Sequence, residues 1–269
     1  MKSSLALLVA GLAAFASAGN VVIDPNNPPA KTEDGQYGWN NCYKHGRDSK
    51  SANCQSLWIG SAEDFCIFAP HAKSTVGSAE RDVVAWCTKA GHGARLIPKG
   101  TFTGVHFIRT PHYIQITAVG DFTKINVAAK DEGGELDPHG ADGYGNPVGG
   151  IVIAQNGAKR VQIQEWSQFL AYNELSIRAC LPGSDAARWC PHVYDVMGSE
   201  WNHPGNYKKG TFDSCTAKDV SYPPGVYKKN GKLSTWYQGV NPTPAAHAPA
   251  ASSKCTSYKT IGGTAKYPV

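Results

Sequence analysis

Several compact catalytic motifs are absent from this sequence. It has no Gly-x-Ser-x-Gly nucleophile elbow, no His-Glu-x-x-His zinc helix and no Gly-x-x-x-x-Gly-Lys-Ser/Thr phosphate loop. These absences weaken an assignment as an enzyme. They do not exclude one, because enzymes that use a pair of carboxylates need no compact motif.

Runs of basic residues and N-glycosylation sequons are also missing. The 26 Lys and Arg residues exceed the 21 Asp and Glu residues only slightly, for a net charge of +5, and they are spread along the chain. We therefore expect no nucleic-acid partner, because such partners select clustered basic side chains. Asn241-Pro-Thr is blocked as a sequon by its proline, so any glycosylation is expected to be O-linked, in the Pro/Ala/Ser/Thr-rich segment 242–257.

The one long apolar stretch lies at the start of the chain. Lys2 precedes the apolar run 5–15, and Ala16-Ser17-Ala18 has the small residues of a cleavage site. The run is too short to span a bilayer. Residues 1–18 are therefore predicted to be a secretory signal peptide. We expect a secreted protein without a membrane partner, which could also associate with the cell wall.

The cysteine content agrees with export. An even number of cysteines in an oxidising compartment indicates disulfides, and no Cys-x-x-Cys or other zinc-module spacing occurs. The pairing cannot be assigned from the sequence, although Cys180 with Cys190 is a plausible local pair. Cys255 near the C-terminus is expected to pair with a core cysteine, or else with another chain. The cysteines are Cys42, Cys54, Cys66, Cys87, Cys180, Cys190, Cys215 and Cys255.

Composition along the chain predicts one domain. An extended Pro/Asn-rich lead over 19–35 precedes a domain over 36–240, and a Pro/Ala/Ser/Thr linker and tail follows over 241–269. About 200 residues are enough for one domain with a substantial core.

The domain is predicted to be mainly β, a disulfide-stabilised sandwich or barrel with one or two short helices. Apolar and polar residues alternate over 102–109 and 114–118, with Pro111-His112 as a turn between them. The best helix candidates are 78–89 and 186–197. A parallel β-helix turn near residues 96–107 is a less favoured alternative.

The central segment 131–150 is acidic and glycine-rich, which predicts a shaped loop. Asp137, His139 and Asp142 could bind a divalent metal, the only cofactor that the sequence suggests. If the protein is an enzyme, Asp137, Asp142 and Glu165 are the candidate acids and bases for cleaving a sugar bond. The alternative is an ordered loop whose Asp and Asn side chains bond their own backbone.

Aromatic residues suggest a glycan ligand. The chain has 7 Trp and 12 Tyr, and aromatic faces stack on the apolar faces of sugar rings. Trp39, Trp201, Trp236 and Tyr237 are the ligand candidates, because each has Asn or Gln beside it or close by. The same composition also suits the core of a secreted β-protein.

Seven runs of sequence carry a family resemblance. They are 38–42, 64–70, 84–98, 121–124, 131–150, 192–198 and 234–244. On these runs the chain resembles the basidiomycete macrophage-activating glycoproteins, the family of the cryptococcal immunoreactive mannoprotein. The resemblance extends over nearly the whole predicted domain, and it supplies no catalytic residues.

The resemblance implies a secreted or wall-associated fungal glycoprotein that host immune receptors recognise. Two departures stand out. The tail is short and lacks a lipid-anchor signal, and Ser199 stands where relatives often have a cysteine. The leading hypothesis is a non-catalytic protein that binds cell-wall or host glycans or acts at the host interface. A carbohydrate-active enzyme and a secreted metal-binding protein are the alternatives.

Overall fold

The computed structural model describes residues 21–263 and 265–268. The predicted signal peptide, 1–18, lies outside the described residues. Within them, no helix is both long and apolar enough to cross a membrane.

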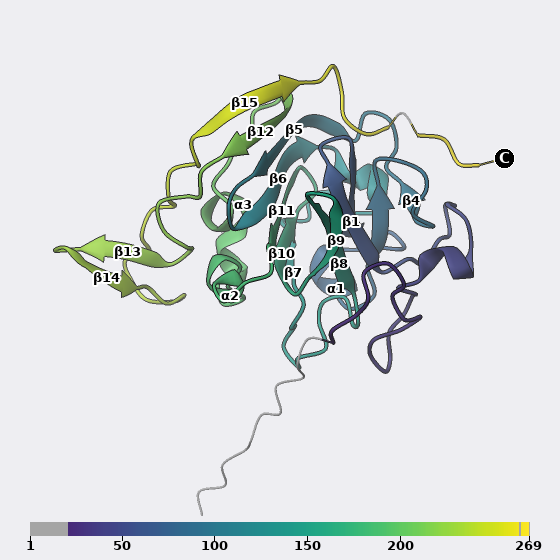
Figure 1. The fold of residues 1–269 in the computed structure, drawn as a ribbon, viewed down its shortest axis with the longest axis horizontal. Helices are drawn as coiled ribbons and strands as arrows, with labels where there is room; N and C mark the ends of the chain where they lie inside the picture. Colours follow the sequence, from purple (N-terminus) through teal and green to yellow (C-terminus); the bar gives the residue numbers. More distant parts are fainter. Residues whose placement is uncertain (1–20, 264, 269) are drawn as a thin grey trace, which may run out of the picture.

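Two large sheets form the body of the molecule (Figure 1). The first has six strands in the order β4-β3-β2-β1-β8-β9. Two of its pairs are parallel, β1 with β8 and β3 with β4, and the others are antiparallel. Its strands are β1 (Ser56–Ser61), β2 (Asp64–Ala69), β3 (Val84–Cys87), β4 (Arg95–Leu96), β8 (Ile151–Asn156) and β9 (Lys159–Ile163).

The second sheet has seven strands in the order β15-β12-β5-β6-β11-β10-β7. Beyond it, the hairpin of β13 (Val226–Lys229) and β14 (Lys232–Thr235) projects from one end of the molecule, at the left of Figure 1. The seven strands are β5 (Phe102–Arg109), β6 (Tyr113–Gly120), β7 (Gly134–Leu136), β10 (Glu165–Leu170), β11 (Glu174–Cys180), β12 (Phe212–Ala217) and β15 (Ser252–Ser257).

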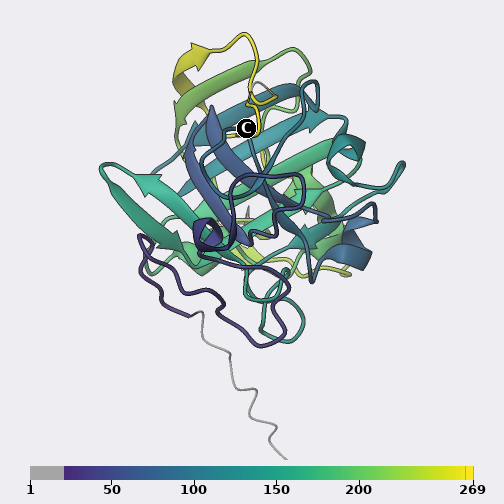
Figure 2. The same ribbon diagram turned by 90° about the vertical axis from the view of Figure 1, so that its right-hand side faces the viewer.

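The main hydrophobic core draws side chains from both sheets, which Figure 2 shows from the side. Phe68 of β2 packs against Trp166 of β10 with ring centroids 5.5 Å apart, and Phe65 meets Phe102 of β5 at 5.9 Å. Burial of these large aromatic surfaces is the main force that holds the layers together. The prediction of a mainly β, disulfide-stabilised single domain is confirmed, with sandwich-like sheets that do not close into a barrel.

The β5–β6 hairpin follows the predicted alternation. Its turn is fixed by Thr110, whose hydroxyl accepts hydrogen bonds from the backbone N–H groups of His112 and Tyr113 at 3.2 and 3.0 Å. Most residues on both faces of these strands are buried, because the sheet is covered on each side.

The helices are shorter than predicted. They are α1 (Val76–Ala79), α2 (Ala186–Trp189) and α3 (Gly198–Asn202), with 3₁₀ turns at Cys42–His45, Phe122–Ile125 and Asp195–Met197. The predicted helix over 78–89 is wrong, because Val84–Cys87 is strand β3 and is buried on both faces. A short apolar run fits a buried strand as well as a helix, so its period does not distinguish them. The predicted helix over 186–197 forms only its first turn before Cys190 and Pro191.

All eight cysteines are paired, as Cys42–Cys54, Cys66–Cys87, Cys180–Cys190 and Cys215–Cys255. The expected local pair Cys180–Cys190 is confirmed. Cys255 does pair with a core cysteine, and this bridge joins β15 to β12 at the edge of the seven-stranded sheet. Part of the segment predicted to be linker and tail therefore adds a strand to the domain.

Candidate functional site

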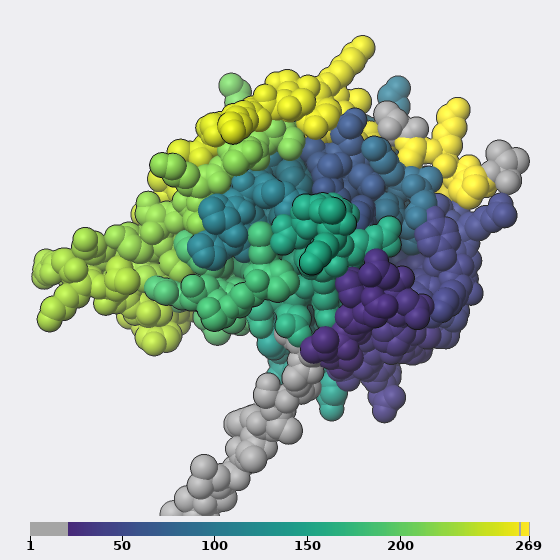
Figure 3. All heavy atoms as spheres, viewed as in Figure 1, coloured from purple at the N-terminus to yellow at the C-terminus, as the bar shows by residue number. Residues whose placement is uncertain are grey.

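A pocket of about 280 Å³ lies where the N-terminal segment meets β1 and β8. Figure 3 shows the N-terminal segment, in deep purple, lying along one side of the molecule. The residues that line the pocket include Asn26, Asn27, Asn40, Asn41, Tyr43, Trp58, His92 and Arg160. The wall therefore combines aromatic rings with four amide side chains and two cations, Lys44 and Arg160.

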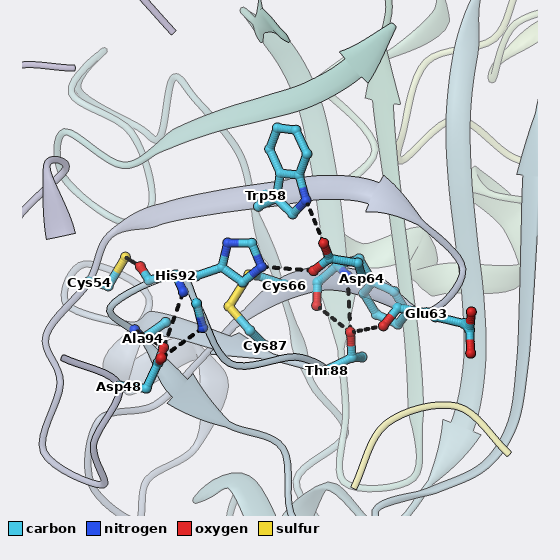
Figure 4. A network of polar contacts seen from close by, with 12 residues as sticks. Asp48, Cys54, Trp58, Glu63, Asp64, Cys66, Cys87, Thr88, His92 and Ala94 are labelled. Atoms are coloured by element: carbon cyan, nitrogen blue, oxygen red, sulfur yellow. Dashed lines mark hydrogen bonds and ion pairs between the residues drawn. A yellow bond between two sulfur atoms is a disulfide. The ribbon is translucent and has the colours of Figure 1, made fainter. Parts of the chain in front are cut away.

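Trp58 and His92 are both held by the carboxylate of Asp64 (Figure 4). The indole Nε1 of Trp58 donates to Oδ2 at 3.2 Å, and Nε2 of His92 lies 2.7 Å from Oδ1. Burial opposes ionisation of Asp64, but the hydrogen bonds from His92 and Trp58 outweigh it, so the pKa of Asp64 is lowered. An ionised carboxylate thus fixes two rings of the pocket wall.

Asp48 shapes the loop that presents His92. Its buried carboxylate accepts backbone N–H groups from Gly91, His92 and Ala94 at 2.7, 3.2 and 3.0 Å. The loop also needs Gly93, which has φ +63°, and whose added Cβ would lie 2.9 Å from the backbone of Cys42. Glycine alone meets both conditions at low cost.

The side chains of the pocket suit a hydroxyl-bearing ring. The guanidinium of Arg160 lies 5.0 Å from the Trp58 ring centroid and the His92 ring stacks 6.2 Å from it, so part of the Trp58 ring is already covered. The buried Oδ1 of Asn41 has no hydrogen-bond partner in the protein. Aromatic surface beside an amide oxygen without a partner is a combination that can bind a sugar. We did not predict Trp58, which lies in the continuous apolar run Leu57-Trp58-Ile59 and so gives no sign of a ligand role.

Trp39, one of the predicted ligand residues, is largely engaged in contacts within the protein. His45 stacks on its ring with centroids 3.9 Å apart, and Nζ of Lys31 lies 4.9 Å from the ring centroid. A role in ligand binding stays a prediction for this residue.

Trp201 and Trp236 form an aromatic cluster with Tyr194. The ring centroids of the two indoles are 5.4 Å apart, and the Trp236 ring stacks on the Tyr194 ring with centroids 5.8 Å apart. Trp201 is buried and its Nε1 donates to a backbone carbonyl at 3.0 Å, which is the environment of a packing residue. Tyr237, beside this cluster in sequence, is 66% exposed and remains open to a ligand.

The predicted metal set of Asp137, His139 and Asp142 does not assemble as expected. Both oxygens of Asp142 bond to Arg81, at 2.7 and 2.9 Å, so this carboxylate serves an ion pair instead. Asp137 accepts the backbone N–H groups of His139 and Gly140 at 2.7 and 2.8 Å, the turn bonding that was the alternative for this loop.

Glu165 does lie beside His139, with Oε2 3.2 Å from Nε2. His192, which the metal prediction omitted, contacts the same oxygen at 2.8 Å. Although burial opposes ionisation, hydrogen bonds from His139 and His192 lower the pKa of Glu165 to about 2. No sequence motif pointed to His192, because it is the Cys180–Cys190 bridge that brings it beside Glu165.

Comparison with known proteins identifies relatives in the basidiomycete fungus Mycosarcoma maydis. The chain is 46% identical to the appressorium protein ROW2 over 267 residues, which cover 97% of this chain and 89% of ROW2. It belongs to the family of the ROW appressorium proteins. It is also 48% identical to the appressorium protein ROW1 over 84% of this chain, which spans about half (53%) of ROW1.

No protein-family model and no solved structure matches this chain. The comparisons support the expectation of a basidiomycete family, but the relatives they find are the ROW proteins and not the mannoproteins that the sequence runs resemble.

Proposed function

We propose that this member of the ROW family is a secreted, non-catalytic protein of the fungal surface. In this proposal it acts where the fungus meets its host and binds cell-wall or host glycans in the Trp58 pocket. The names of ROW1 and ROW2 support the setting, because an appressorium is the structure with which a fungus enters its host. The predicted signal peptide and the four disulfides support export.

The pocket carries the proposal of glycan binding. Its volume of about 280 Å³ is near the small end of the range for small-molecule sites, roughly 300 Å³ and above, which suits one sugar unit of a longer chain. The Trp58 indole is fixed by Asp64, so little side-chain entropy is lost when a ring packs against it. Oδ1 of Asn41 can then accept a hydrogen bond from a sugar hydroxyl.

Glycosylation and immune recognition belong to the same proposal. Thr243, Ser252 and Ser253 are exposed in the Pro/Ala/Ser/Thr-rich segment, where O-linked chains could be attached without disturbing the core. Host immune receptors that bind such glycans would then contact this end of the molecule.

The test is retention of the purified protein on insoluble chitin, β-glucan, cellulose and mannan, with soluble sugar assayed in the same tubes. We expect depletion from solution on at least one polymer and no release of sugar. Trp58→Ala and Asn41→Ala should each abolish retention, whereas Tyr237→Ala should retain it.

Each result discriminates between the alternatives. Sugar release would make the protein a carbohydrate-active enzyme. Retention that survives Trp58→Ala but is lost in Tyr237→Ala would move the site to the exposed tyrosine. Circular dichroism of each variant shows whether a loss of retention reflects unfolding.

A further inference from the structure

Three side chains from distant segments meet at the end of the seven-stranded sheet. His139 lies in the loop after β7, Glu165 is the first residue of β10, and His192 follows α2. One oxygen of Glu165 faces Nε2 of both imidazoles, at 3.2 and 2.8 Å, and the three potential ligand atoms lie within 4.8 Å of one another.

The fold itself builds this arrangement. Strand β7 pairs with β10 so that Leu136 lies opposite Gln168, and continuing this antiparallel register brings His139 toward Glu165. On the other side of β10, Glu165 lies opposite Cys180, which is bonded to Cys190, two residues before His192. The sheet register and the disulfide therefore place both histidines beside the carboxylate of Glu165.

The separations match those of bound metal ligands. Zinc lies about 2.0–2.2 Å from imidazole nitrogen and carboxylate oxygen, so neighbouring ligands in a tetrahedral site are roughly 3.3 Å apart. The two observed nitrogen–oxygen separations, 3.2 and 2.8 Å, are hydrogen-bond lengths, so a bound cation would move these side chains apart by up to about 0.5 Å.

The hydrogen bonding of His192 is compatible with a bound cation. In the neutral ring, a proton on Nε2 would bond Glu165 and leave Nδ1 as a bare acceptor. That atom is buried, has no hydrogen-bond partner, and lies 4.0 Å from the carboxylate oxygen of Asp137. If a metal binds Nε2, the proton of the neutral ring lies on Nδ1 and points toward Asp137. Carboxylates in this outer-shell position orient histidine ligands in metal sites.

From this geometry we infer that His139, Glu165 and His192 bind one divalent transition-metal ion. Two imidazoles and one carboxylate favour zinc and its neighbours in the first transition series over calcium or magnesium, which prefer oxygen ligands. The side chain of His139 is 36% exposed, so at least one coordination position can face solvent and take water or a ligand. The other grouping of this kind among the described residues, His106, Asp213 and Cys215, is unsuitable because the sulfur of Cys215 is in a disulfide.

The test uses the whole purified protein after removal of metal with a chelator. Titration with Zn²⁺ should show one ion bound per chain, and Co²⁺ should give visible absorption bands that Zn²⁺ removes. Calcium and magnesium in large excess should not compete. His192→Gln and His139→Gln should each weaken zinc binding by more than about 100-fold, because the loss of an outer-shell partner alone costs about 10–100-fold.

Asp142→Asn is the matched control. It removes a carboxylate from the same loop but not from the cluster, so zinc affinity should stay within about threefold of the unmodified protein, well short of the 10–100-fold outer-shell effect. His139 is the more exposed of the two histidines, so His139→Gln remains informative if His192→Gln fails to fold. The inference is overturned if no Zn²⁺ or Co²⁺ binds, or if the bound ion is unaffected by both histidine substitutions.

Discussion

Gly60 of β1 leaves the space into which the indole of Trp58 folds. A Cβ atom at this position would lie 2.6 Å from Nε1 of Trp58, closer than non-bonded contacts allow. The same Nε1 donates to Asp64 at 3.2 Å. The absence of a side chain at Gly60 is therefore a condition for the conformation of the pocket tryptophan.

Gly60→Ala is expected to displace the Trp58 indole and weaken retention on the polymer that binds the native protein, with little loss of fold. The added methyl group touches the end of a side chain rather than backbone, so the stability cost should stay in the usual range of roughly 0.5–3 kcal/mol. Gly77→Ala is the control, because nothing lies within 4 Å of its added Cβ. Equal retention by both variants would contradict a role for Trp58.

Asp48→Ala should destabilise the protein by about 3 kcal/mol. The substitution leaves the backbone N–H groups of Gly91, His92 and Ala94 without their charged acceptor in a buried loop. Urea unfolding measures the change, and glycan retention should fall with it because the loop carries His92. Asp34→Ala, at an exposed carboxylate, should change stability by less than about 0.5 kcal/mol. Similar unfolding midpoints for the two variants would rule out this role of Asp48.

Removing the Cys215–Cys255 bridge by paired serine substitution should lower the free energy of unfolding by about 4 kcal/mol. The bridge closes a loop with a sequence separation of 40, and in the chain-entropy account such a cross-link acts by restricting the unfolded state. Chemical denaturation with the other three bridges intact gives the measurement. A loss below about 1 kcal/mol would show that β15 is held mainly by its hydrogen bonds to β12.

Stability should fall as pH drops below about 6.5 because of His203. Its ring is buried between the hydroxyls of Ser167 and Ser176, at 2.9 and 2.8 Å. Burial first, and then the charge of Arg178, hold the pKa of His203 well below its usual value. The unfolded chain therefore binds a proton that the folded chain does not, so acid favours unfolding, by up to about 1.4 kcal/mol per pH unit.

Urea unfolding at pH 7 and pH 5 tests this effect. His203→Asn should reduce the loss of stability between the two pH values, whereas substitution of the half-exposed His112 should leave it unchanged. If the native protein and His203→Asn lose equal stability, the pH dependence comes from other groups.

The sequence alone determined the class of structure and the presence of disulfides. Alternation over 102–109 and 114–118 predicted the β5–β6 hairpin, because a period of two residues reports a strand directly. The even number of cysteines predicted disulfides, and the short spacing of Cys180 and Cys190 pointed to their bridge. These properties depend on composition and on residues that are close in the chain, so they can be predicted from the sequence.

The strand at Val84–Cys87 shows where local pattern was insufficient. Four apolar residues in a row fit a helix or a buried strand equally well, and the two-sided burial that selects a strand comes from the rest of the sheet. In the same way, the acidic loop indicated ligands for a metal but not which ones. Asp142 was equally plausible by spacing, yet Arg81, 61 residues away, bonds both of its oxygens.

Only the tertiary structure decided which polar groups meet. Glu165 is joined to His139 through the β7–β10 register and to His192 through the Cys180–Cys190 bridge. Trp58, Asp64 and His92 likewise come from two strands and a loop. Residue types and periodicity are local properties of the chain, which the sequence displays. Contacts between distant segments depend on strand order, register and disulfide pairing, and these are fixed only when the whole core packs.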